Sequence, residues 1–134
     1  MQHSSQKTLL AALFTLLSTS AMADSFQNRW EDATQPLTVN GNSQFTLEDS
    51  GEGFIRIKEK FSNKYLNIET GSLNSSPIST GWFSAQWKLI QTGDGWFRLQ
   101  NRWKPDQYIH VETGSAKAGS IESGWHSAQW QINK

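Results

Sequence analysis

Apolar and polar residues alternate with a period of two along much of this chain, the pattern of β-strands with one buried face. The alternation is plain in Phe54–Phe61 and in Tyr108–Glu112. Glycine, asparagine and proline interrupt it at short intervals, and Asn40-Gly41 is a dipeptide typical of tight hairpin turns. After residue 23, no stretch of eleven residues has the 3.6-residue period of a helix. The pattern therefore predicts an all-β protein.

The chain also repeats itself. Tyr65–Leu89 matches Tyr108–Ile132 at 12 of 25 positions, with an offset of 43 residues. A shorter copy precedes these two, and its offset from the last copy grows from 73 to 85, so it lacks about a dozen residues, including a Gly-Trp segment. The matching blocks of the first and last copies are Gln27–Trp30 with Gln100–Trp103, Leu37–Val39 with Ile109–Val111, and Ser43–Leu47 with Ala128–Ile132.

Three copies of up to four short strands predict a β-trefoil. One copy cannot bury its own apolar face, so the copies must pack on one another. The first and fourth strands of each copy would build a barrel, which the second and third strands cap. The copies span about residues 24–51, 52–93 and 94–134, and are called repeats one, two and three here; repeat one is shortened. A β-sandwich is the alternative.

The first 23 residues have the pattern of a cleaved signal peptide. Lys7 provides the positive charge, Thr8–Leu17 is a ten-residue apolar segment, and Ala21-Met22-Ala23 is a small-x-small cleavage site. Ten apolar residues are too few to span a bilayer, which takes about 20. We therefore expect an exported protein, periplasmic or secreted, whose single domain covers residues 24–134.

Composition and net charge limit the classes of binding partner. The whole chain has 12 basic and 12 acidic residues, and removal of Lys7 leaves 11 against 12, a formal charge of −1. This balance argues against a nucleic acid and against an anionic membrane surface, both of which need clustered basic residues. Residues 24–134 contain 15 aromatic residues, namely 7 Trp, 6 Phe and 2 Tyr, which must fill a core or form a binding surface. We expect a monomer, because a closed trefoil needs no partner to cover its edges.

Candidate ligand contacts lie on the second strand of repeats two and three. If the aliphatic residues of this strand face the core, the alternating residues share the outer face. An aromatic ring beside hydrogen-bonding groups suits a sugar, whose apolar face stacks on the ring. Alternatively, the tyrosines pack on a neighbouring hairpin and the glutamates bond a turn amide. The candidates are Tyr65, Asn67 and Glu69 in repeat two, and Tyr108, His110 and Glu112 in repeat three. In repeat one, Gln35, Thr38 and Asn40 look unable to bind.

The tryptophans divide into two groups. Trp82 and Trp125 each follow a glycine at a turn, and serve either as stacking platforms for a sugar or as caps on the barrel. Trp87 and Trp130 match Phe45 and precede an aliphatic strand, so we expect them to form a three-fold core layer. The same interpretation extends to the repeated aromatic residues Trp30, Phe61 and Trp103, near the barrel rim.

The sequence points to no catalytic residue, no metal site and no cofactor. Cysteine is absent, only His110 and His126 follow residue 23, and no nucleophile motif or acidic calcium loop occurs. Glu69 and Glu112 could form a carboxylate pair only if two equivalent positions of different repeats met. We therefore expect a binding protein and not an enzyme.

The repeats resemble the ricin-type β-trefoil lectins, and more narrowly the family 13 carbohydrate-binding modules of bacterial polysaccharide-degrading enzymes. The resemblance rests on the Tyr-Leu-x-Ile/Val strand and on the late Gln-Trp of each long repeat, Gln86-Trp87 and Gln129-Trp130. The family hallmark is Gln-x-Trp, and its Gln is replaced by Ala85 and Ala128 here. The sugar-binding Asp of the family is also replaced, by residues of the second strand: Thr38, Asn67 and His110.

The resemblance implies a polysaccharide- or glycan-binding module with sites in repeats two and three. The alternative is a protein-binding trefoil that acts as an inhibitor or immunity-type protein towards a hydrolase or toxin. Such a protein would place its contacts on loops, for instance Ser72–Pro77 or Lys117–Glu122.

Overall fold

The computed structural model describes residues 24–133, so the predicted signal peptide, residues 1–23, lies outside the described part. Within that part no helix is long and apolar enough to cross a membrane. The elements are the strands β1 (Ser25–Asn28), β2 (Phe45–Gly51), β3 (Phe54–Glu59), β4 (Tyr65–Asn67), β5 (Asn74–Ser76), β6 (Trp87–Gln91), β7 (Phe97–Asn101), β8 (Tyr108–His110), β9 (Lys117–Gly119) and β10 (Trp130–Asn133), with the single-turn 3-10 helices η1 (Phe83–Ala85) and η2 (His126–Ala128).

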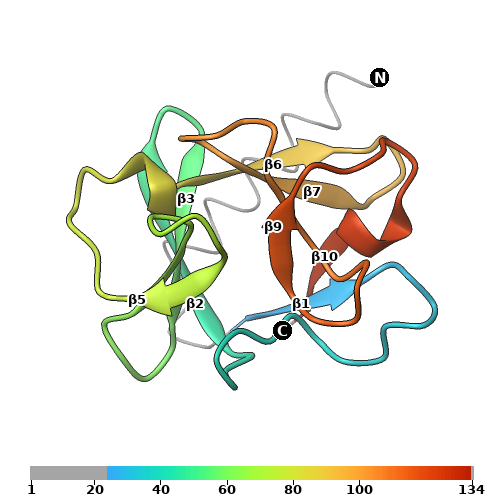
Figure 1. Ribbon diagram of the computed structural model, residues 1–134, viewed down its shortest axis with the longest axis horizontal. Helices are drawn as coiled ribbons and strands as arrows, with labels where there is room; N and C mark the ends of the chain where they lie inside the picture. Colours follow the sequence, from blue (N-terminus) through green and yellow to red (C-terminus); the bar gives the residue numbers. More distant parts are fainter. Residues whose placement is uncertain (1–23, 134) are drawn as a thin grey trace.

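Six of these strands close into a barrel (Figure 1). Antiparallel pairing runs in the order β1, β10, β7, β6, β3 and β2. Asp24, just before β1, then pairs with Phe45 of β2 through two backbone hydrogen bonds of 2.7 and 2.8 Å. The pairing thus returns to its starting strand, as the trefoil prediction requires.

The barrel has the three-fold repetition that the sequence predicts. In every repeat the first strand meets the fourth at one equivalent pair of residues. The three pairs consist of residues that the sequence repeat aligns with one another, which confirms the alignment of the shortened repeat. The pairs are Asp24 with Phe45, Ile55 with Trp87, and Phe97 with Trp130. The fold is therefore the predicted β-trefoil.

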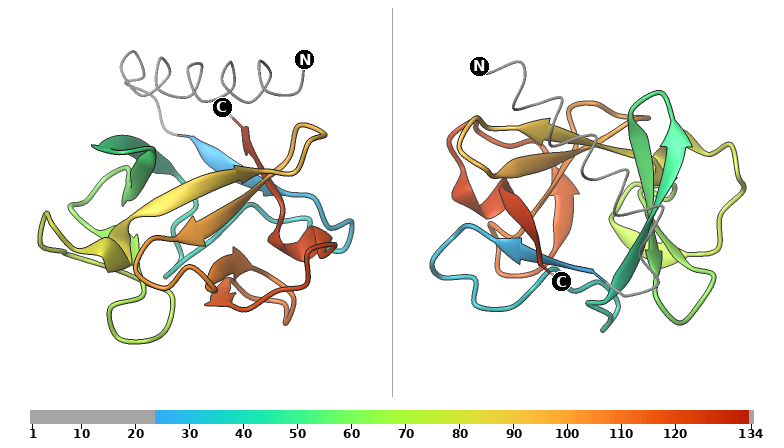
Figure 2. Two further views of the ribbon diagram at one scale, coloured as in Figure 1. Left: turned by 90° about the horizontal axis from the view of Figure 1, so that it is seen from above. Right: turned by 180° about the vertical axis from the view of Figure 1, so that it is seen from behind.

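Hairpins from the second and third strands cover one end of the barrel (Figure 2, left). Repeats two and three have the hairpins β4–β5 and β8–β9. In repeat one, Val39 and Asn42 exchange two backbone hydrogen bonds of 2.9 and 3.0 Å around a two-residue turn. Asn40 and Gly41 both have positive φ, 51° and 82°, as a type I′ turn requires, which confirms the predicted hairpin turn. Residues 41–44 contain no counterpart of η1 or η2.

The core is built in three-fold layers. Phe45, Trp87 and Trp130 are fully buried, as predicted. The indole Nε1 of Trp87 donates a hydrogen bond of 3.0 Å to the Leu66 carbonyl, and that of Trp130 makes the same bond to the Ile109 carbonyl. A second layer consists of Phe26, Ile57 and Leu99.

The prediction that the other repeated aromatic residues also belong to the core is wrong. Phe61 is 84% exposed and Trp103 is 44% exposed, while Trp30 is partly buried. The backbone N–H of Trp103 donates to Oδ1 of Asn101 at 2.9 Å, and that of Trp30 donates in the same way to Asn28. This asparagine turn ends the strand alternation, so the following ring is no longer directed to the core.

Candidate functional site

The structure places Asn67 and His110 inside the protein. Leu66 and Ile68 face the core as expected, but Asn67 is only 1% exposed and His110 only 7% exposed. The prediction that these two polar residues share an exposed face with their neighbours is therefore wrong. The second strand is three residues long and turns immediately, and the side chain at this position stabilises the turn. Oδ1 of Asn67 accepts the N–H of Glu69 at 3.0 Å.

His110 occupies the same position with different chemistry. Its Nδ1 accepts the N–H of Glu112 at 3.1 Å, so the neutral ring carries its proton on Nε2. Burial lowers the pKa of His110, Glu112 opposes this effect, and Lys117 lowers the pKa further. The ring is therefore neutral at pH 7 and offers Nε2–H as a donor, which makes no hydrogen bond to any of residues 24–133.

The residue opposite on the third strand of each hairpin determines whether the side-chain donor of Asn67 or His110 has a hydrogen-bond partner. In repeat two, Nδ2 of Asn67 donates to the Ser76 hydroxyl at 2.8 Å. In repeat three the position of Ser76 is taken by Gly119, and a Cβ there would lie 3.2 Å from Nε2 of His110. A serine would crowd the imidazole, whereas glycine leaves the space beside Nε2 without a side chain.

Glu112 and Trp125 are brought together with His110 around η2. The Glu112 carboxylate accepts the Ser127 hydroxyl of η2 at 2.5 Å, and Trp125 immediately precedes η2. The partly buried indole of Trp125 meets the His110 ring edge-on, with 6.2 Å between ring centroids and an angle of 70°. The indole of Trp125, the free Nε2–H of His110 and the exposed carboxylate of Glu112 thus lie close together.

Repeat two has the same arrangement around η1 without the imidazole. The Glu69 carboxylate accepts the Ser84 hydroxyl at 2.6 Å, and Trp82 precedes η1 and is partly buried. The glutamates therefore bond serine hydroxyls of the 3-10 helices, and not turn amides as the alternative interpretation supposed. Asn67 uses both of its amide hydrogens within the protein, on Ser76 and on the Tyr65 carbonyl.

The two tyrosines bond other elements. The Tyr65 hydroxyl donates to Glu48 of β2 at 3.0 Å, and burial together with this carboxylate raises the pKa of Tyr65. The Tyr108 hydroxyl accepts Nε2 of Gln100 of β7 at 3.1 Å. Both rings are partly buried, as packing against neighbouring strands requires. The structure thus groups the glutamates with the tryptophans, and it ties the tyrosines to the barrel strands.

Among residues 24–133, no three His, Cys, Asp or Glu side chains are placed to hold a metal ion. The two glutamates of the arrangement each belong to a different repeat, and each is bonded to its own serine. What the groups around η1 and η2 can do is stack on a ligand and exchange hydrogen bonds with it.

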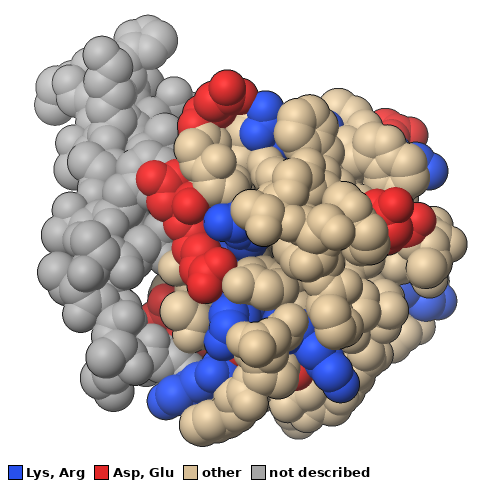
Figure 3. Space-filling view, turned by 90° about the vertical axis from the view of Figure 1, so that its left-hand side faces the viewer, with Lys and Arg blue, Asp and Glu red and all other residues tan. Residues whose placement is uncertain are grey.

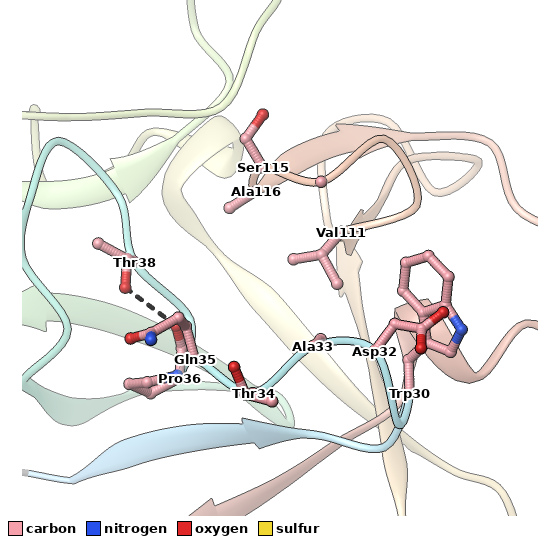
Figure 4. Close-up of a pocket in the computed structure, with 11 residues that line it drawn as sticks. Trp30, Asp32, Ala33, Thr34, Gln35, Pro36, Thr38, Val111, Ser115 and Ala116 are labelled. Carbon is pink, nitrogen blue, oxygen red and sulfur yellow. Dashed lines mark hydrogen bonds between the residues drawn. The ribbon is translucent and has the colours of Figure 1, made fainter.

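A pocket that the sequence analysis missed lies between repeats one and three (Figure 4). It measures 480 Å³, within the range of roughly 300–1,000 Å³ that is usual for ligand pockets. Residues 30–38 form one side and residues 111–116 the other. One signal was visible in the sequence, because the segment between the aligned ends of the first and second strands is longest in repeat one. Eight residues separate Asn28 from Leu37, against six between Glu59 and Leu66 and seven between Asn101 and Ile109.

Fold and arrangement together define a β-trefoil of the lectin-like class. The family model described as "Ricin-type beta-trefoil lectin domain-like" matches residues 41–125. The chain belongs to this family, which confirms the resemblance seen in the sequence. Comparison with curated protein sequences gives no match.

Solved structures show the same fold. A GlcNAcα1-4Gal-releasing endo-β-galactosidase from Clostridium perfringens is 27% identical, with a TM-score of 0.73 over 84% of this chain; the match covers 32% of the enzyme chain, about a third of its length. The designed three-fold symmetric protein ThreeFoil is 21% identical, with a TM-score of 0.64 over 84% of this chain and 98% of its own. SeviL, solved with an asialo-GM1 saccharide, is 16% identical, with a TM-score of 0.63 over 86% of this chain and 98% of its own.

Proposed function

We propose that this protein is an exported glycan-binding module whose sites lie beside η2 in repeat three and η1 in repeat two. The observation that carries the proposal is the group formed by Trp125, His110 and Glu112. A pyranose has an apolar face that an indole can cover, and hydroxyls that a neutral imidazole N–H and a carboxylate can bond. Family membership and the saccharide-bound SeviL support the same class of ligand.

The two sites differ in strength under this proposal. Repeat three has the free Nε2–H of His110, whereas the corresponding amide of Asn67 in repeat two is already bonded to Ser76. We therefore expect tighter binding at Trp125 than at Trp82. Two sites on one rigid barrel would act together on a polymer, because the second contact is made at high effective concentration.

The surface around repeat two is suited to an uncharged polymer. On the face of Figure 3, lysine and arginine lie next to aspartate and glutamate, and uncharged side chains cover most of the area. Neutral glycans bind through rings and hydroxyls, so they need no field of one sign.

The test is a titration of the purified protein with a panel of soluble polysaccharides, followed by tryptophan fluorescence. A saturable change with one polymer supports the proposal, and Trp125→Ala should then weaken binding about tenfold or more, because it removes a stacking ring. Trp82→Ala should have the smaller effect. Trp103→Ala is the matched control, since Trp103 is exposed and lies outside both sites. Binding that survives both Trp82→Ala and Trp125→Ala would refute the site assignment.

A protein partner is the second candidate. Phe61 is the most exposed large apolar residue of the described chain, and Phe83 and Trp103 are also exposed. Exposed aromatic residues are enriched in protein interfaces. No response to any polysaccharide, from a protein that still unfolds cooperatively, would favour an inhibitor or immunity-type role. Export itself is tested by N-terminal sequencing of the secreted or periplasmic protein, which we expect to begin at Asp24.

A further inference from the structure

We infer that the pocket between repeats one and three is a separate sugar site, selective for neutral or amino-bearing pyranoses over acidic ones. This inference rests on the proposed glycan-binding function. It assigns a ligand to repeat one, the repeat whose shortened sequence looked unable to bind, and it uses none of the residues around η1 and η2.

The walls carry the chemistry that a sugar needs. Trp30 and Asp32 lie at one end of the pocket, and Gln35 and Thr38 lie at the other (Figure 4). Val111 projects into the pocket from repeat three and supplies an apolar surface on the opposite side. An aromatic ring, an apolar wall and polar groups at both ends match the apolar face and the hydroxyl rim of a pyranose.

The polar groups of this pocket are available to a ligand. The carboxylate of Asp32 and the amide of Gln35 are exposed, and neither bonds another residue of the described range 24–133. The Thr38 hydroxyl donates to the Pro36 carbonyl at 2.9 Å, so it can still accept a hydrogen bond but has no proton left to donate. These three residues offer two acceptors and one amide that can both donate and accept, and Thr34 and Ser115 also line the pocket.

Charge decides which sugars fit. Asp32 is the one charged residue among those that line the pocket. The neighbouring cation, Arg29, is bonded to Asp94 at 2.6 Å and to Gln129 at 2.8 Å, outside the pocket. A sugar carboxylate would meet the Asp32 carboxylate without a compensating cation, whereas a hydroxyl or an ammonium group would bond it.

One wall of the pocket carries a small side chain. Ala116 of repeat three aligns with Leu73 of repeat two, and both pack against the core. Where repeat two has an isobutyl group, repeat three has a methyl group, and Ala116 lines the pocket. Ala116→Leu therefore introduces a side chain that the fold already accepts at the equivalent position, and its three added carbons should narrow the pocket while the protein stays folded.

Repeat three also offers a matched control for Trp30. Trp103 has the same position in its repeat and the same Asn-Arg-Trp context, and its N–H bonds the preceding asparagine in the same way. Trp103 does not line this pocket. A sugar in the pocket must perturb Trp30 and leave Trp103 unchanged.

The experiment is ¹⁹F NMR of the protein with its seven tryptophans replaced by 5-fluorotryptophan, and single Trp→Phe variants assign the signals. The labelled protein is titrated with galactose, glucose, N-acetylglucosamine, glucosamine and glucuronic acid, each as the monosaccharide and as short oligomers. At least one neutral or amino sugar should move the Trp30 signal saturably, and glucuronic acid should not. Ala116→Leu should weaken that response and leave the Trp125 response intact. Asp32→Asn, at an exposed position, should weaken glucosamine binding roughly tenfold, as loss of a charge-assisted hydrogen bond does.

The outcomes separate this inference from the proposed function. If sugars move the Trp125 signal and never that of Trp30, the module binds glycans and the inferred pocket site is overturned. If no sugar moves either signal, both fail. A Trp30 response that is as strong in Ala116→Leu as in the unchanged protein, or as strong with glucuronic acid as with the neutral sugars, also overturns the inference.

Discussion

Replacement of Trp87 by phenylalanine tests how the three-fold core holds the barrel together. Trp87 is fully buried, and its Nε1 donates to the Leu66 carbonyl at 3.0 Å. Phenylalanine stands naturally at the equivalent position of repeat one, as Phe45, so the barrel can accept the ring. Trp87→Phe removes the donor from a buried carbonyl, which costs about 1–3 kcal/mol. It also removes two ring carbons, at about 0.8 kcal/mol each. The expected loss of unfolding free energy is therefore about 2.6–4.6 kcal/mol.

This loss is large for a domain of this size. The 110 described residues correspond to a total stability of roughly 5–16 kcal/mol. Urea unfolding followed by far-ultraviolet circular dichroism measures the change, and the midpoint should fall by about 1–3 M with an unchanged slope. Trp130→Phe should cost the same amount within about 1 kcal/mol, because Trp130 makes the equivalent bond to the Ile109 carbonyl.

Trp103→Phe is the control for this series, because Trp103 is 44% exposed and should change stability by less than about 0.5 kcal/mol. A loss below about 1 kcal/mol for Trp87→Phe, or an equal loss for Trp103→Phe, would refute the reasoning. Either result would mean that the indole hydrogen bond and the core layer contribute little to the barrel.

Two further predictions concern polar groups. Burial alone would raise the pKa of Glu59, but hydrogen bonds from Ser75 and other neighbours hold the pKa of this carboxyl below 4.5 in the folded protein. The ionised carboxylate therefore stabilises the fold fully above pH 4.5, and this contribution is lost as the pH falls through the lowered pKa. In a series of urea midpoints measured against pH, Glu59→Gln should flatten that part of the curve. Gly119→Ser alone should destabilise the protein, because the new Cβ would lie 3.2 Å from Nε2 of His110. Combined with His110→Asn it recreates the Asn67–Ser76 pair of repeat two, so a double-mutant cycle should give a coupling free energy of about 1 kcal/mol. Additive effects of the two substitutions would contradict this prediction.

The internal repeat made the fold predictable, because it is a property of the chain itself. Equivalent residues of three copies must occupy equivalent places, so the offsets alone paired Phe45 with Trp87 and Trp130 and predicted a shared core layer. The same comparison located the shortened repeat, and the Asn40-Gly41 dipeptide identified its turn. Local chemistry was sufficient for these features.

Alternation failed where strands end. It placed Asn67 and His110 outside and Phe61 and Trp103 inside, and both placements are wrong. Period-two alternation holds only while the backbone stays extended, and here a side-chain hydrogen bond turns the chain after three residues or at the strand end. Such turns are local, but whether the side chain beyond them is covered depends on another repeat.

What the sequence by itself determined is the all-β trefoil, its three repeats and its tryptophan core, because periodicity and repetition act along the chain. Tertiary structure alone decided the sites. His110 is an available donor only because Gly119 lies opposite it across a hairpin, and the pocket between repeats forms where residues 111–116 meet residues 30–38, which are far away in the sequence. Both depend on which side chains the closed barrel brings into contact, and closure joins segments that no local pattern connects.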